Sequence, residues 1–298
     1  MTAAGNPAVT PARPTRGGRF TVSWVGVVPF FVYVGLFLLL PTAIIVVGSF
    51  TDPKGGFSLA NFQGINKPYM LKSFQQSLII SAISAGAGAI FGSLLAYAVV
   101  TGNPNGILRR AVMSASGVLA QFGGVALAFA FIATLGTIGF VTEFLLNHGI
   151  DIFHNGVWLY ETPGLILIYV YFQIPLMLLV FLPALDGLRP QWREAAESLG
   201  GSTWHYWRYV AGPLLAPSFL GCTLLLFANA FSAYATAAAL LTQGGVLVPL
   251  QIQALITSET EAAQPGLAQA LALAMIIIVV IVMSLYALLQ RRTSRWLR

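Results

Sequence analysis

The stretch Glu194-Ala195-Ala196-Glu197-Ser198-Leu199-Gly200-Gly201 lies between two long apolar runs, and Val210-Ala211-Gly212-Pro213 follows it with nine residues between Gly200 and Val210. Pro190 suits the first turn of a helix, and apolar residues then recur at helical spacing as far as Leu199. Gly200-Gly201 ends that helix, and Ser202 is a suitable N-cap for a second short helix. The stretch therefore predicts two short helices joined by glycines, a shape suited to pressing into another protein.

The rest of the chain has the composition of an integral membrane protein. Of its 298 residues, 57% are hydrophobic and only 8% are charged, whereas soluble domains have about 25% charged residues. A bilayer core about 30 Å thick needs roughly 20 apolar residues per helix. Six runs qualify, at about 24–50, 74–100, 111–135, 162–185, 213–241 and 266–289. The sequence thus predicts an all-α membrane protein with six transmembrane helices.

Basic residues predict the orientation of these spans, because cytoplasmic loops of membrane proteins carry an excess of Lys and Arg. Twelve of the fifteen Lys and Arg residues lie on the side that holds both termini and the loop 186–212, and only Lys54, Lys67 and Lys72 lie on the other side. Both termini and this loop are therefore expected in the cytoplasm. The net charge of +6 is explained by this topology and by affinity for anionic lipid, so no nucleic-acid partner is expected.

The chain is expected to have two parts. Residues 1–18 are mostly Ala, Gly, Pro, Thr and Arg, a composition that cannot bury an apolar core, so they are expected to form a disordered cytoplasmic arm. Residues 19–298 are expected to form the transmembrane domain. In the second span, Gly88 and Gly92 form a GxxxG pair, which permits close approach of a neighbouring helix.

The quoted stretch resembles the EAA loop of ATP-binding-cassette importer permeases. In that pattern, Glu-Ala-Ala is followed by three residues, Gly, nine residues, a β-branched aliphatic residue, one residue and Leu-Pro. Every element is present here except the Leu, whose place is taken by Gly212. The general resemblance extends over most of the chain, from about residue 24 onward, and the loop is its specific part.

The resemblance implies a six-helix permease of the type I importer fold in a bacterial plasma membrane. It implies an assembly of two such permeases, identical or homologous, with two ATPase subunits and an extracytoplasmic solute-binding protein. In this family the loop docks on the ATPase and carries its motion into the membrane. The residues expected at or near this contact are Glu194, Ala195, Ala196, Leu199, Gly200, Trp204 and Pro213.

Within the family, the chain looks most like the branch that handles spermidine and putrescine, iron(III), thiamine or phosphonates. A small polar solute is therefore the expected substrate. Two alternatives stay open at this point. One is a sugar-type permease, and the other is a membrane scaffold or channel whose cytoplasmic hairpin holds another protein.

The chemistry missing from the sequence supports an external energy source. No GxxxxGK[ST] phosphate-binding loop is present, so ATP and Mg²⁺ are expected to act through a separate ATPase. No catalytic residue, metal site or cofactor is expected in this chain. The middles of the six spans hold no Asp, Glu, Lys, Arg or His, which argues against a proton relay. Energy is expected to arrive mechanically, through the loop.

Neutral polar side chains inside the spans are candidates for the translocation path. They are Gln121, Gln173, Asn229, Ser232 and Tyr234. The alternative for any single one is a hydrogen bond between helices, worth about 0.6 kcal/mol on average in membranes. The group from Asn229 to Tyr234 on the fifth span is favoured for the path because it is clustered.

Overall fold

The structure is a computed structural model that describes residues 20–52, 55–103, 106–154, 156–241, 247–257 and 264–294. Two compact units divide the chain, Met1–Val47 and Gly48–Arg298, and each is described by itself. The expected disordered arm, residues 1–18, lies outside the described residues.

The first unit contains a long apolar helix. Here α1 (Phe20–Val34) continues through a π-helical turn, η1 (Gly35–Leu39), into α2 (Leu40–Ser49), whose last residues belong to the second unit. Side chains such as Phe30, Phe37 and Val47 are more than half exposed. An apolar helix with exposed side chains suits a lipid or protein environment rather than water.

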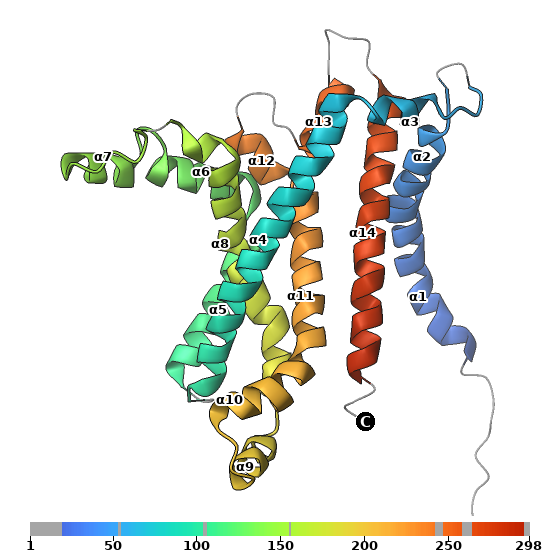
Figure 1. The fold of residues 1–298 in the computed structure, drawn as a ribbon. Coiled ribbons are helices and arrows are strands. Elements are labelled where there is room, and N and C mark those ends of the chain that lie inside the picture. Colours follow the sequence, from blue (N-terminus) through green and yellow to red (C-terminus); the bar gives the residue numbers. More distant parts are fainter. Residues whose placement is uncertain are drawn as a thin grey trace, which may run out of the picture. The chain divides into compact units, whose positions relative to one another are not determined.

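The second unit is built from helices and short connections, shown in Figure 1. The helices are α3 (Ala60–Ile65), α4 (Pro68–Thr101), α5 (Ile107–Gln121), α6 (Gly124–Leu135), α7 (Phe140–Asn147), η2 (Trp158–Tyr160), α8 (Thr162–Asp186), α9 (Pro190–Ser198), α10 (Thr203–Tyr206), η3 (Trp207–Ala211), α11 (Gly212–Ser232), α12 (Ala235–Leu240), α13 (Val248–Thr257) and α14 (Pro265–Ser294). An isolated bridge between Thr51 and Phe57 is the β feature found in the described part of the chain.

Six helical stretches among the described residues are long and apolar enough to cross a membrane. They are Val27–Ser49, Pro68–Thr101, Gly124–Asn147, Thr162–Asp186, Thr203–Ser232 and Pro265–Leu289. Their number equals the number of spans expected from the sequence. The prediction of an all-α protein with six membrane-spanning helices is confirmed.

Two of the expected spans are interrupted, which the sequence analysis did not predict. The expected helix 111–135 is divided into α5 and α6 at Phe122-Gly123, and Gly124 follows with a φ of +67°. Glycine adopts positive φ at little cost, so this Gly-Gly pair lets the chain leave the helix. The expected helix 213–241 is divided into α11 and α12 at Ala233-Tyr234. The two interruptions meet, because a Cβ at Gly124 would lie 3.5 Å from the Cβ of Ala235.

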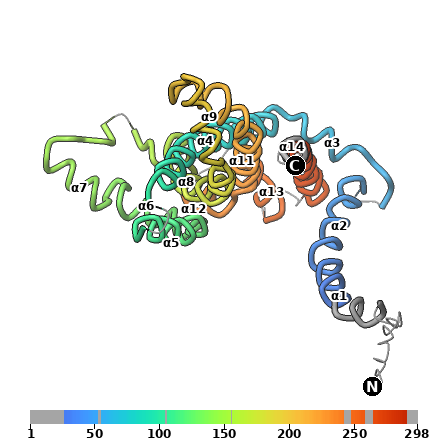
Figure 2. The backbone as a smooth tube through the Cα atoms, turned by 90° about the horizontal axis from the view of Figure 1, so that it is seen from below, coloured from blue at the N-terminus to red at the C-terminus, as the bar shows by residue number. Residues whose placement is uncertain are grey.

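The centre of the second unit is formed by α4, α8 and α11, which lie together in both Figure 1 and Figure 2. Gly88 and Gly92 of α4 face α8. A Cβ at Gly88 would lie 2.6 Å from the Cβ of Gln173, and a Cβ at Gly92 would lie 2.5 Å from the Cβ of Met177. The close helix approach predicted from the GxxxG pair is therefore confirmed.

Candidate functional site

The helix α9 carries the Glu-Ala-Ala sequence and ends in a Schellman turn. Its first residue is Pro190. A backbone N–H at this position has no partner within the helix, so proline loses no hydrogen bond there. The N–H of Gly200 donates to the carbonyl oxygen of Glu197, and the N–H of Gly201 donates to that of Ala196, each at 2.9 Å. Gly200 has a φ of +78°, a left-handed conformation that costs other residues about 1–2 kcal/mol. The turn after α9 therefore favours glycine at position 200.

The next helix begins at the predicted cap. Ser202 Oγ accepts a hydrogen bond from the backbone N–H of His205 at 3.4 Å and lies 2.8 Å from Nδ1 of the same residue. The N-cap predicted at Ser202 is thus confirmed. From here α10 leads through the π-helical turn η3 into α11, and Pro213 lies in the first turn of α11.

The candidate coupling residues lie mainly on the surface of this segment. No residue of α9 is buried; Glu194 and Ala195 are exposed, and Ala196 is half-buried. Two large apolar side chains are also exposed, Leu199 with 89% of its surface and Trp204 with 68%. Exposed apolar groups in an otherwise polar loop are typical of a surface that binds another protein.

Two ion pairs order the charges near this segment. Within α9, Arg193 Nε donates to Glu197 Oε1 at 2.9 Å, and this hydrogen bond raises the pKa of the Arg193 guanidinium. Both side chains are at least half exposed, so the pair orients them without adding much stability. Arg109 of α5 pairs with Asp186 at the end of α8, at 2.7 Å. The second pair links the start of α5 to the point where the segment leaves the helix bundle.

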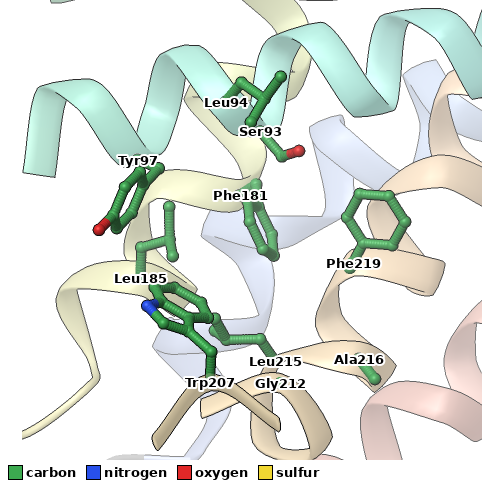
Figure 3. A pocket seen from close by; sticks show the side chains of 10 residues that line it. All are labelled: Ser93, Leu94, Tyr97, Phe181, Leu185, Trp207, Gly212, Leu215, Ala216 and Phe219. Atoms are coloured by element: carbon green, nitrogen blue, oxygen red, sulfur yellow. The ribbon is translucent and has the colours of Figure 1, made fainter. Parts of the chain in front are cut away.

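A largely apolar cavity of about 480 Å³ lies where this segment joins the bundle, and Figure 3 shows its lining. Its walls come from α4, α8, η3 and α11. The rings of Tyr97 and Trp207 lie 5.3 Å apart at 82°, an edge-to-face arrangement that aromatic pairs favour. Trp207 and Gly212 lie on the same stretch of chain in Figure 3, and Tyr97 projects toward them from α4. This cavity therefore borders the joint between η3 and α11.

A second cavity, of about 280 Å³, lies where the two interrupted spans meet. Asn229, Ser232 and Tyr234 line it, together with Gly123, Gly124 and residues at the start of α12. Tyr234 is bonded through its hydroxyl to Gln253 Oε1 of α13. None of the residues that line this cavity is charged. The structure thus brings together the three candidate path residues of the fifth span in one neutral, partly polar space.

The other two candidate path residues lie elsewhere. Gln173 is fully buried between α4 and α8, and its Nε2 donates to Ser84 Oγ at 3.0 Å. This is the hydrogen bond between helices that the sequence left open as an alternative. Gln121 is the last residue of α5 and does not line the cavity, although Ala120 does.

The sequence analysis missed the interruptions that shape the second cavity. Gly123-Gly124 is a local breaker signal inside an apolar run, and a search for glycine pairs within spans finds it. Ala233-Tyr234 contains neither Gly nor Pro. The second interruption therefore has no such local signal.

Discontinuous membrane helices that meet around a cavity occur at the substrate sites of many transporters. Residues 88–295 match the family described as "Binding-protein-dependent transport system inner membrane component". The chain belongs to this family. It is a multi-pass protein of the bacterial plasma membrane and a permease subunit of an ATP-binding-cassette importer.

Individual relatives agree with this assignment. The sulfate transport system permease protein CysW of Escherichia coli (strain K12) is 26% identical over 248 residues, which cover 82% of this chain and 79% of CysW. The thiamine transport system permease protein ThiP of the same strain is 31% identical over 77 residues, which cover 26% of this chain and 14% of ThiP. A bacterial ABC transporter for import of the acidic polysaccharide alginate has the same fold, with a TM-score of 0.69 at 17% identity over 92% of this chain and 95% of the solved chain.

Proposed function

We propose that the loop 186–212 is the coupling loop of this permease and that it docks on a separate ATPase subunit in the cytoplasm. The observation that carries the proposal is the exposed, glycine-closed helix α9, which presents Glu194 and Ala195 on a segment with no buried residue. Leu199 and Trp204 supply apolar surface for the contact. The excess of Lys and Arg on this side of the sequence supports its cytoplasmic orientation.

The proposed assembly has two permease subunits, two ATPase subunits and one extracytoplasmic solute-binding protein. ATP and Mg²⁺ act in the ATPase pair, which on binding ATP draws the two coupling loops together. The loop continues directly into α11, so this movement is passed to the membrane span that carries Asn229 and Ser232. Hydrolysis then resets the assembly.

We also propose that the cavity of about 280 Å³ between the interrupted spans is part of the solute path. Asn229 and Ser232 are exposed, and their neutral groups can exchange hydrogen bonds with a solute that has lost part of its water. A lining without charge does not hold an ion tightly, which suits a site that solute must leave again.

The proposed substrate is a small polar solute received from the binding protein. Sulfate is the first to test, because the sulfate permease CysW matches this chain over most of both lengths. Thiamine, iron(III), phosphonates and the polyamines spermidine and putrescine are the next candidates. The resemblance to the spermidine and putrescine branch stays a prediction.

Photo-crosslinking tests the docking role directly. The photoreactive amino acid p-benzoylphenylalanine replaces Leu199, which is 89% exposed, in the complete complex. The matched control carries it at Ile138, which is 94% exposed between α6 and α7, on the expected outer side. The Leu199 position is expected to form an adduct with the ATPase subunit, and the Ile138 position is not. An ATPase adduct from position 138 and none from position 199 would reverse the proposed orientation and remove the coupling role.

A further inference from the structure

Residues Thr203–Ser232 form an unbroken helical run even though Pro213 lies inside it. Here α10, η3 and α11 follow one another with no residue between them. Proline has no N–H to donate, and its ring contacts the Cβ of the preceding residue when that residue is in the α conformation. Helices therefore usually end at or before the residue that precedes a proline. In this chain a π-helical turn leads into each of two such prolines, since η1 ends before Leu40-Pro41 and η3 ends before Gly212-Pro213.

Gly212 removes a steric obstacle at the end of this turn. It has φ −59° and ψ −56°, in the α region. A Cβ at this position would lie 2.5 Å from the carbonyl oxygen of Trp207. That same carbonyl accepts the hydrogen bond from the Gly212 N–H that closes the π-helical turn. Leu40 closes the π-helical turn η1 and is also followed by a proline, Pro41, so the need for glycine at 212 comes from the close carbonyl and not from the following proline.

We infer that Gly212 is a positioning residue that joins the coupling loop to α11 as one continuous helix, at the place where the family pattern has Leu. The inference rests on the proposed docking role of the loop. Trp207 steadies the joint, because its ring packs edge-to-face on Tyr97 of α4 at 5.3 Å and borders the apolar cavity of about 480 Å³ beside Gly212, as Figure 3 shows.

The continuous helix connects the two parts of the candidate functional site. Its first end is α10, in the proposed ATPase contact, and its last residues, Asn229 and Ser232, line the second cavity. At 1.5 Å per residue, the run from Thr203 to Ser232 is about 45 Å long. Continuity at Gly212 is thus what allows a rotation of the coupling loop to reach the cavity.

The test uses the complete complex in proteoliposomes and the variants Gly212→Leu, which restores the family pattern, and Gly212→Ala. Gly117→Leu is the matched control, because Gly117 also lies in a helix and a Cβ there meets nothing within 4 Å. Spin labels on Thr203→Cys and Leu220→Cys, in a Cys222→Ser background, report the distance across the joint by double electron–electron resonance. Along the helix axis the two backbone positions are separated by at most about 25 Å, so a single narrow distribution at or below this distance is expected.

Gly212→Leu is expected to broaden or shift this distribution, with loss of solute uptake while ATP hydrolysis continues and the KM for ATP is unchanged. Gly212→Ala is expected to give a smaller loss, and Gly117→Leu none. An unchanged narrow distribution in Gly212→Leu overturns the inference, because the joint then tolerates a side chain. A broadened distribution with normal uptake per ATP also overturns it, since continuity would not carry the movement.

These outcomes are separate from failure of the docking role. The adduct between position 199 and the ATPase does not depend on the residue at 212. If that adduct is absent in the parent complex, the docking role fails whatever the label distances are. If the adduct forms and Gly212→Leu behaves like the parent, the docking role stands and only the inference about Gly212 fails.

Discussion

Replacement of Gly200 by Val is expected to uncouple transport from ATP hydrolysis without preventing insertion of the protein into the membrane. Gly200 has a φ of +78° and nothing within 4 Å of its missing Cβ, so the cost is conformational and not a clash. A left-handed conformation costs a residue with a side chain about 1–2 kcal/mol. That free energy lowers the population of the native turn by a factor of about 5–30.

This conformational free energy is large relative to the stability of α9, because few other interactions stabilise this helix. It has nine residues, none of them buried, and helices of this length are marginal without tertiary packing. Loss of the turn also removes the two hydrogen bonds of 2.9 Å that tie Gly200 and Gly201 to the end of α9. The Glu-Ala-Ala surface is therefore expected to lose its fixed geometry. The spans are expected to stay folded, because no residue of α9 is buried in their core.

The assay combines uptake and ATP hydrolysis by the reconstituted complex with hydrogen exchange over residues 190–201. The control is Gly149→Val, because Gly149 ends α7 in the same way, with a φ of +81° and open space around it. Its N–H donates to the carbonyl oxygen of Leu146 at 3.0 Å, and the N–H of Ile150 donates to that of Leu145 at 2.9 Å. Faster exchange in α9 with normal uptake in Gly200→Val, or equal losses of uptake in both variants, would refute the reasoning.

Three further outcomes are expected. Gly92→Leu should lower the free energy of unfolding of the purified protein by about 1–3 kcal/mol or more, since its Cβ would lie 2.5 Å from a neighbouring side chain in α8. Gly86→Leu should change this free energy little, because a Cβ at Gly86 meets nothing within 4 Å. The reverse order in melting experiments would contradict the packing. Asn229→Leu should reduce the rate of solute uptake while ATP hydrolysis by the complex is retained, and unchanged uptake would remove this residue from the path. Arg109→Ala should lower the free energy of unfolding by at most about 1 kcal/mol, because the ion pair of Arg109 with Asp186 is partly exposed. A larger loss in denaturant unfolding would show that the pair anchors α5.

The number of spans and the hairpin could be predicted because they depend on local signals. A run of about 20 apolar residues is recognisable wherever it packs. Pro190, Gly200 and Ser202 each fix one helix end through their own backbone or side-chain chemistry. The structure places each of them at the helix end that the sequence indicated.

The shape of the second cavity could not be predicted in the same way. Hydropathy does not distinguish one helix of 29 residues from two helices that meet at an angle, because both are apolar throughout. Ala233-Tyr234 carries no breaker residue, yet the chain leaves the helix there and the Ala233 carbonyl oxygen accepts a hydrogen bond from the Tyr169 hydroxyl at 2.8 Å. Tyr169 is 64 residues away in sequence, so this interruption depends on a contact that only the folded chain makes.

The arrangement of α11 indicates how a movement at the proposed coupling loop can change the second cavity. From Gly212 to Ser232 the helix is about 30 Å long at 1.5 Å per residue. A tilt of roughly 10° about its Gly212 end therefore displaces the Ser232 end by about 5 Å. A cavity of about 280 Å³ is of similar width, so a displacement of this size is enough to open or close it. Among the described residues, Pro217 is another point in α11 where bending can occur, and bending there would shorten the part of the helix that moves as one body.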